Sequence, residues 1–288
     1  MLFLFLLMYV SCKPPIEKEQ AQMNKQRVLA IGDLHADLAA TKDVFQLAKI
    51  IDGEGNWIAT NTTVVQTGDL TDRGPNGKTL LQFIQKLERE APQHNSQLIS
   101  LIGNHESMNI LGDWRYVSPK DVEEFGGKEA RIQAFSPHGE WFEWILTHNA
   151  VAKVDNTVFV HGGISTTYSK MGIEGLNEAI KKSLSTRSRD SILGSDGPLW
   201  YRGFAQDPEE IACPALNTAL HNLNAKRMVV GHTTQRDGSI SSRCEGKLLI
   251  IDTGISHHYG SHLAILDLTN DDAKAIYLEK GLDLPDPN

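Results

Sequence analysis

Short runs of consecutive apolar residues recur along the chain, and each run breaks into glycine and polar residues at its carboxyl end. The runs are rich in valine and isoleucine. Apolar residues occupy both alternating faces, which is typical of strands that are buried on both sides. We therefore expect strands at residues 27–33, 63–69, 98–104, 157–163, 227–233, 248–254 and 262–268.

Segments with a helical spacing of apolar residues lie between these runs. Strands that alternate with helices are typical of a layered α/β domain. The sequence therefore predicts a domain of this class, with helices at residues 40–51, 77–90, 139–148, 175–185 and 214–224.

Two long segments, residues 107–150 and 165–225, separate neighbouring strands. We interpret them as one helical rim over the carboxyl ends of the strands and not as a second domain. Tryptophan residues on such segments usually belong to a local core. We interpret those of the rim in this way: Trp114, Trp141, Trp144 and Trp200.

Polar fragments follow five of the predicted strands. They read GDLH at 32–35, GDLTDRG at 68–74, GNHE at 103–106, HGG at 161–163 and GHT at 231–233. Ligands of α/β domains bind beyond the carboxyl ends of the strands. We therefore expect these fragments to share one mouth. The run at 248–254 also contains a carboxylate, Asp252, to which we assign no role.

The side chains of these fragments suit a pair of metal ions. Asp33 and His35 can share one cation, and the two oxygens of Asp69 can bridge two cations. Mixed nitrogen and oxygen ligands favour Mn, Fe, Zn or Co over Ca. The predicted ligands are Asp33, His35, Asp69, Asn104, His161 and His232.

These five fragments, in this order, resemble the phosphoprotein phosphatase family of calcineurin-like metallophosphoesterases. RYVSP at 115–119, GPLWYRG at 197–203 and RMVVGHT at 227–233 resemble its Shewanella-like branch, and the likeness covers residues 27 to about 260. It implies a metallophosphoesterase fold, in which two mixed β-sheets pack as a sandwich flanked by helices.

The resemblance also implies a function: a phosphomonoester hydrolase that depends on two divalent metal ions and acts on a phosphorylated protein or peptide. Matching the family's motifs assigns one ion to Asp33, His35 and Asp69. The other is assigned to Asp69 with Asn104, His161 and His232. A metal-bridging hydroxide would attack the phosphorus. Two ions, two carboxylates and one hydroxide leave a positive surplus, which suits a phosphate dianion.

The remaining roles concern the leaving group and the phosphate oxygens. His105 adjoins a ligand but is not counted as one, so we expect it to act as general acid. Asp72 matches the family's partner of that histidine. Arg73 and Arg202 match arginines that bind phosphate, and Tyr259 is expected to line the mouth.

Three other residues of these segments receive structural roles. We expect Glu106 to cap the helix or turn that follows its strand. His257 and His258 are expected to lie on a surface loop.

Two alternative functions are considered. A dinucleoside-polyphosphate hydrolase shares the metal fragments, but the complete DRG and the GPLWYRG segment disfavour it. A non-catalytic binding protein on the same scaffold would have lost a ligand or the acid. Every predicted ligand and His105 are present, which disfavours that alternative as well.

The amino terminus has a different composition from the rest. Residues 1–10 form an apolar run, Cys12 follows Ser11, and residues 13–26 are polar. We interpret residues 1–12 as a signal peptide of lipoprotein type, with a lipidated Cys12 as membrane anchor. Residues 13–26 would be a flexible tether, and residues 27–288 the catalytic domain. A plain secretory signal and a mis-assigned start are the alternatives.

Charge and cysteine content complete the predictions. The formal net charge of -8 argues against nucleic-acid binding. Export to the periplasm, free or anchored, would place Cys213 and Cys244 in an oxidising compartment. They form either a disulfide or two buried thiols. The sequence predicts no particular oligomeric state.

Overall fold

The structure is a computed structural model and describes residues 26–269, 272–278, 281–285 and 287. The predicted signal peptide, Cys12 and nearly all of the predicted tether lie outside the described residues. Among the described helices, none combines the length and the apolar character that a membrane crossing requires.

The first sheet has six strands in the order β11-β10-β9-β1-β2-β3. The neighbours β1, β2 and β3 run parallel, whereas β9, β10 and β11 continue the sheet with antiparallel pairings. The bounds are β1 (Arg27–Ile31), β2 (Thr62–Gln66), β3 (Gln97–Ser100), β9 (Ala264–Asp267), β10 (Lys274–Tyr277) and β11 (Gly281–Asp283).

The second sheet has five strands in the order β4-β5-β6-β8-β7. Here β5, β6 and β8 are parallel, and β4 and β7 pair antiparallel at the two edges. The bounds are β4 (Val151–Val154), β5 (Thr157–Val160), β6 (Arg227–Val230), β7 (Ser241–Arg243) and β8 (Leu248–Ile250). Two mixed sheets are therefore present, and the predicted fold is confirmed.

Two hydrophobic clusters explain why the strands are apolar on both faces. Val28 and Ala30 of β1 belong to a cluster that also contains Phe159 of β5, so it fills the space between the sheets. Leu29 and Ile31 point the other way, into a larger cluster that includes residues of the flanking helices. Residues of β1 therefore alternate between two cores.

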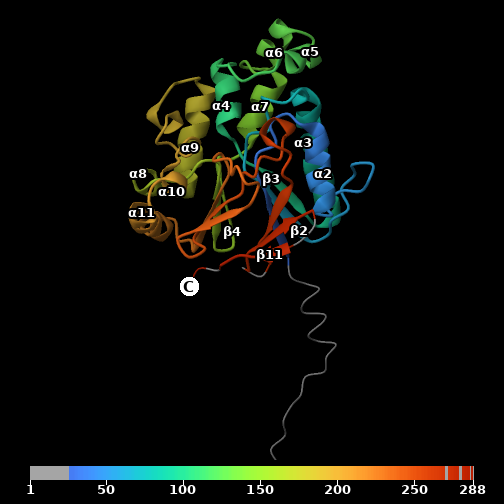
Figure 1. The fold of residues 1–288 in the computed structure, drawn as a ribbon. Coiled ribbons are helices and arrows are strands. Elements are labelled where there is room, and N and C mark those ends of the chain that lie inside the picture. The colour runs from blue at the N-terminus through green and yellow to red at the C-terminus, as the bar shows by residue number, and fades with distance from the viewer. Residues whose placement is uncertain (1–25, 270–271, 279–280, 286, 288) are drawn as a thin grey trace, which may run out of the picture.

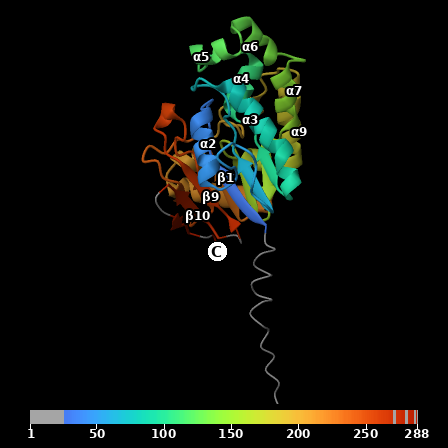
Figure 2. The same ribbon diagram turned by 90° about the vertical axis from the view of Figure 1, so that its right-hand side faces the viewer.

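The helices flank this sandwich, and α5 and α6 lie at the end of the molecule farthest from the C-terminus (Figures 1 and 2). The α-helices are α2 (Leu38–Leu47), α3 (Gly77–Glu90), α4 (Asn104–Leu111), α5 (Pro119–Glu124), α6 (Lys128–Ala134), α7 (Glu140–Thr147), α8 (Thr166–Ser169), α9 (Gly172–Ser185), α10 (Gly203–Gln206) and α11 (Glu209–Asn222). Within the described residues, the 3-10 turns are η1 (Ala91–His94), η2 (Ser191–Leu193) and η3 (His257–Tyr259).

Two tryptophans of the rim and the two cysteines can be compared with their predicted roles. Trp141 is 1% exposed and belongs to the core. The half-buried Trp144 packs against it edge to face, with ring centroids 5.6 Å apart. Cys213 of α11 and Cys244 after β7 are joined by a disulfide, with their Cα atoms 5.4 Å apart. Of the two alternatives for the cysteines, the structure contains the disulfide.

The predicted strand at 98–104 differs from the structure, because β3 ends at Ser100 and α4 begins at Asn104. A helix begins there because Glu106 accepts the backbone N–H of Gly103, the residue before the helix. Asn104 and His105 therefore lie on the first turn of a helix and not at the end of a strand.

The Glu106 carboxylate also fixes the loop after β2. Its Oε2 accepts the N–H groups of Gly103 and Asp69, both at 2.9 Å. Its Oε1 accepts the N–H groups of Leu70 and Thr71 and the Thr71 hydroxyl, at 2.9–3.0 Å. The predicted capping role is confirmed, and the same carboxylate joins two segments far apart in the sequence.

Two glycines allow these segments to approach each other. A Cβ atom on Gly103 would lie 2.2 Å from Oδ1 of Asp69, and one on Gly68 would lie 2.6 Å from the nitrogen of Gly103. Gly68 also has a φ of 95°, which disfavours other residues. Side chains at either position would push the Asp69 loop away from α4.

We predict that Glu106→Gln lowers the free energy of unfolding, measured by urea denaturation. The amide would present its own N–H₂ to backbone donors. A hydrogen bond to a charged group contributes about 1.5–3 kcal/mol, so losing two would cost at least about 3 kcal/mol.

The matched control is Glu124→Gln. Oε2 of Glu124 accepts the Lys78 N–H at 2.8 Å in a less buried place, and loss of such a cap costs about 1 kcal/mol. Equal losses in the two variants would show that Glu106 does not hold the loop as described.

Candidate active site

Residues that follow β1, β2 and β6, together with the first turn of α4, line one cavity of about 350 Å³. The predicted site residues Asp72 and His161 are fully buried and contact His105 and Asp69 of its lining. The remaining predicted site residues line the cavity itself: Asp33, His35, Asp69, Arg73, Asn104, His105, Arg202, His232 and Tyr259. The structure therefore brings all the predicted site residues together.

The backbone at these positions is unusual. Left-handed φ values occur at His35 (48°), Asp69 (57°), Asp72 (69°), Arg73 (69°) and His232 (64°). Such conformations are strained for residues with a side chain, persist only where the surroundings fix them, and cluster at functional sites. At Asp69 the hydrogen bond to the Glu106 carboxylate provides that constraint.

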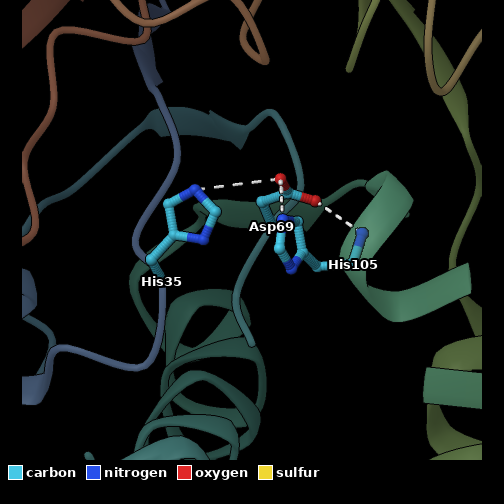
Figure 3. A group of neighbouring side chains, drawn as sticks. All are labelled: His35, Asp69 and His105. Atoms are coloured by element: carbon cyan, nitrogen blue, oxygen red, sulfur yellow. Dashed lines mark hydrogen bonds and ion pairs between the residues drawn. The ribbon is translucent and has the colours of Figure 1, made fainter. Parts of the chain in front are cut away.

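Asp69 lies at the centre of the cluster. Its Oδ2 is 3.2 Å from Nε2 of His161, 3.7 Å from Nε2 of His105 and 3.8 Å from Nε2 of His35. Figure 3 shows the His35 and His105 rings reaching the same oxygen of this carboxylate from different directions, and the two ring centres are 4.9 Å apart. Oδ1 of Asp69 accepts the backbone N–H of His105. Burial opposes ionisation of Asp69, but His161 and His105, when their rings are protonated, outweigh burial and hold the Asp69 pKa well below its usual value.

The hydrogen bonds of His161 show what the cluster can bind. Its Nδ1 lies 2.9 Å from the carbonyl of Thr67, which can only accept, so Nδ1 carries the proton. In the neutral ring, Nε2 then presents a lone pair to Oδ1 of Asn104 at 2.8 Å and to Oδ2 of Asp69. A cation between these three acceptors would replace their repulsion with attraction.

Two further imidazoles have the properties of metal ligands. Burial lowers the pKa of His35 to about 3, and burial also lowers the pKa of His232 well below its usual value. Both rings are therefore neutral near pH 7, as a metal ligand must be. Nε2 of His232 is buried and finds no hydrogen-bond partner among the described residues. Together, these residues fit divalent metal ions with nitrogen and oxygen ligands.

Asp33 adds a second carboxylate beside Asp69. Burial, followed by the charges of Asp252 and Asp69, raises the pKa of Asp33 well above its usual value. Oδ2 of Asp33 is 3.8 Å from Nε2 of His35, and both of its oxygens accept the N–H of His232. A positive ion beside the two carboxylates would offset their repulsion.

His105 differs from the other histidines in the partner of its Nδ1. That atom lies 2.7 Å from Oδ2 of Asp72, a carboxylate, whereas the Nδ1 atoms of His35 and His161 face backbone carbonyls. Burial opposes protonation of His105, but Asp69 and Asp72 outweigh it and raise its pKa. Its ring is therefore suited to hold a proton beside the cavity.

Two arginines reach the same cavity. The Arg73 guanidinium lies 3.8 Å from the ring centre of Tyr116 and 5.9 Å from that of Tyr259. Its Nε is buried without a hydrogen-bond partner in the described part of the chain. Nη2 of Arg202 donates to the carbonyl of His232 at 3.3 Å. The cavity thus contains guanidinium donors that could bind phosphate oxygens.

Sequence reasoning missed part of the lining. Trp200 was interpreted as local core, but it also lines the cavity, with its ring centre 5.5 Å from that of His232. Tyr116 lies in the RYVSP segment and was given no role, although its ring centre is 5.2 Å from that of His105. The strand pattern carries no signal for either residue, because both come from the rim.

The remaining polar residues have structural partners or line the wall. Asp252, left without a role, lines the cavity, and burial raises its pKa to about 6. Arg236 lines the cavity as well. The expected surface position of His257 and His258 is confirmed. Nδ1 of His257 forms a hydrogen bond with Oδ2 of Asp37 at 2.7 Å.

Comparisons with known proteins agree with this geometry. Residues 26–236 match the family described as "Calcineurin-like phosphoesterase". Shewanella-like protein phosphatase 1 of Plasmodium berghei is 35% identical over 80% of this chain and 67% of its own. Shewanella-like protein phosphatase 2 of Arabidopsis thaliana is 33% identical over 80% of this chain and 72% of its own.

Among solved structures, the cold-active protein-tyrosine phosphatase of a psychrophilic Shewanella species is similar, with a TM-score of 0.79 and 27% identity. The match covers 90% of this chain and 80% of that protein. The resemblance seen in the motifs is thereby confirmed. The chain belongs to the calcineurin-like phosphoesterase family, within its Shewanella-like phosphatase branch.

Proposed function

We propose that this chain is a metal-dependent protein phosphatase, which hydrolyses phosphomonoesters of protein side chains with two divalent ions of Mn, Fe or Zn. The observation that carries the proposal is the position of the Asp69 carboxylate, which lies within 3.8 Å of a nitrogen atom of each of three imidazoles. Asp69 lines a cavity that Arg73 and Arg202 line as well. This arrangement combines a metal site with donors for phosphate.

The ligands divide around Asp69. Asp33 and His35 would hold one ion with it, and Asn104, His161 and His232 would hold the other. When bound, the two ions would offset phosphate charge and make hydroxide available near neutral pH. The neutral amide of Asn104 preserves a positive surplus that a further carboxylate would remove.

Arg73 and Arg202 would bind the phosphate oxygens that face away from the ions. Each guanidinium offers paired N–H donors that match two oxygens. The Arg73 side chain is held against the Tyr116 ring at 3.8 Å, so its position is largely set before substrate binds. This should orient the phosphorus for attack in line with the leaving group.

His105 would donate a proton to the departing oxygen. Its Nδ1 is bonded to Asp72, which leaves Nε2 to face the cavity side of the ring. Alkoxides and phenoxides are poor leaving groups, and a general acid is the group that makes their departure easier. His105 and Asp72 would therefore act together on this step.

The substrate class follows from the wall of the cavity and from the relatives. Tyr116, Trp200 and Tyr259 place three aromatic rings around the site, which suits an aromatic phosphoester. A solved relative is named a protein-tyrosine phosphatase, and two sequence relatives are named protein phosphatases. We propose that phosphotyrosine is preferred over phosphoserine and phosphothreonine.

The chain's location is proposed from the amino terminus. An apolar run followed by Cys12 supports export, with membrane anchoring through that cysteine. The disulfide between Cys213 and Cys244 suits an oxidising compartment. Export to the periplasm, with or without the anchor, is our proposal.

A phosphopeptide panel tests the function. The Mn-loaded protein should hydrolyse a phosphotyrosine peptide faster than matched phosphoserine and phosphothreonine peptides, with phosphate release as the readout. Diadenosine tetraphosphate should be a much poorer substrate. Faster cleavage of the dinucleotide would favour the alternative hydrolase, and no release from any substrate would favour a binding protein.

We predict that Asp69→Asn loses both metal ions together, because the bridging carboxylate is replaced by a neutral amide. Metal analysis of the purified protein measures this directly. Asp43→Asn, on the exposed face of α2, is the control and should retain the content of the unaltered protein. Two full equivalents in Asp69→Asn would contradict the bridge.

We predict that His105→Ala lowers turnover of phenyl phosphate far more than that of p-nitrophenyl phosphate, while metal content is retained. General acid catalysis contributes about 10²–10⁴-fold, and only the poorer leaving group needs most of it. His138→Ala, which is fully at the surface, is the control. Equal losses on the two esters would argue against the acid role.

A further inference from the structure

The two oxygens of Asp72 have different partners. Oδ2 faces Nδ1 of His105 at 2.7 Å. Oδ1 accepts from Nδ2 of Asn109 at 2.9 Å and from Nη2 of Arg131 at 3.2 Å. Asp72, Asn109 and Arg131 are all at most 3% exposed. The orientation of the carboxylate toward His105 is therefore set by donors on its opposite side.

Arg131 comes from α6, in the rim, and each of the three nitrogens of its guanidinium donates a hydrogen bond. Its Nη1 donates to Oδ1 of Asn109 at 2.6 Å, and its Nε donates to Oδ2 of Asp121 at 2.8 Å. The rings of Phe125 and Phe135 lie 5.3 Å and 4.9 Å from the guanidinium carbon. A planar guanidinium that donates to three different acceptors is held in a fixed orientation.

Asp121 anchors the outer side of this network. Its Oδ1 accepts the N–H of Gly77, the first residue of α3, at 2.9 Å. Arg131 therefore lies between two buried carboxylates, Asp121 and Asp72, and balances charge that would be costly without it. The chain of contacts runs from α3 through α5 and α6 to Asp72.

We infer that Arg131 is a positioning residue, which holds Asp72 in the orientation that supports His105 as a proton donor. This inference rests on the proposed phosphatase function. Arg131 does not line the cavity that contains the predicted metal ligands, and instead lines a second one of about 280 Å³ within the rim. It acts on His105 only through Asp72.

A purely structural role would have a different signature. An arginine that merely stabilises the rim should, when replaced, lower activity on all esters by the same factor. A positioning residue of the acid should affect an ester in proportion to its need for a proton. The ratio of turnover on p-nitrophenyl phosphate to that on phenyl phosphate separates the two roles.

The test uses the full chain loaded with Mn and the variant Arg131→Met, which keeps an unbranched apolar stem but removes the charge and the donors. The turnover ratio should rise about 10- to 100-fold over the unaltered protein, with KM for both esters little changed. In an Asp72→Asn background, the same substitution should change the ratio less than about twofold, because the two residues act in one chain.

The matched control is Arg227→Met. Arg227 is an equally buried arginine at the start of β6, where its Nε donates to the carbonyl of Gly246. Replacing Arg227 should leave the turnover ratio equal to that of the unaltered protein. An equal fall on both esters in Arg131→Met, or an undiminished shift in the Asp72→Asn background, would overturn the inference.

Arg131→Lys covers the case in which Arg131→Met does not fold, as judged by circular dichroism. Lysine keeps the charge, but it lacks the fork that reaches Asp72, Asn109 and Asp121 together. A rise in the ratio supports positioning, and an unchanged ratio rejects it.

If the unaltered protein hydrolyses neither ester, the proposed function fails. If it hydrolyses both while the Arg131 variants lose equally, only this inference fails.

Discussion

The buried carboxylate of Glu106 is the constraint on which the site depends. It accepts hydrogen bonds from the start of α4 and from residues 69–71 after β2, two segments that no strand pairing joins. The left-handed backbone at Asp69 persists because of these bonds, and Asp69 in turn lies at the centre of three imidazoles. The geometry of the predicted metal ligands therefore depends on Glu106, a residue that does not line the cavity.

Partners of the imidazole Nδ1 atoms divide the histidines into two kinds. A backbone carbonyl beside His35 and His161 can only accept, so it places a proton on Nδ1 and leaves Nε2 as the atom that could bind a metal ion. The carboxylate beside His105 favours the charged ring instead. Three histidines around one Asp69 can thus serve different purposes, because their outer partners differ in charge.

The layered α/β class and the residues at the strand ends could be predicted from the apolar pattern and the motifs that follow it. The sandwich of two sheets came from the resemblance that those motifs carry. Asn104 shows the limit of that pattern, because the cap formed by Glu106 begins a helix where a strand was expected. Tyr116 and Arg131 were given no role, and Trp200 was interpreted as local core, since these residues come from the rim and reach the site by tertiary packing. The spacing of apolar residues along the chain does not predict such packing.

The disulfide encloses the segment from Cys213 to Cys244, and His232 lies within it. Thiol reductants are commonly added to keep metal enzymes from oxidising. In this chain a reductant strong enough to open the disulfide would also release the segment that presents a predicted metal ligand. The forms with the disulfide closed and opened are different chemical species. Metal contents and rates should therefore be compared between preparations in which the disulfide is in the same state.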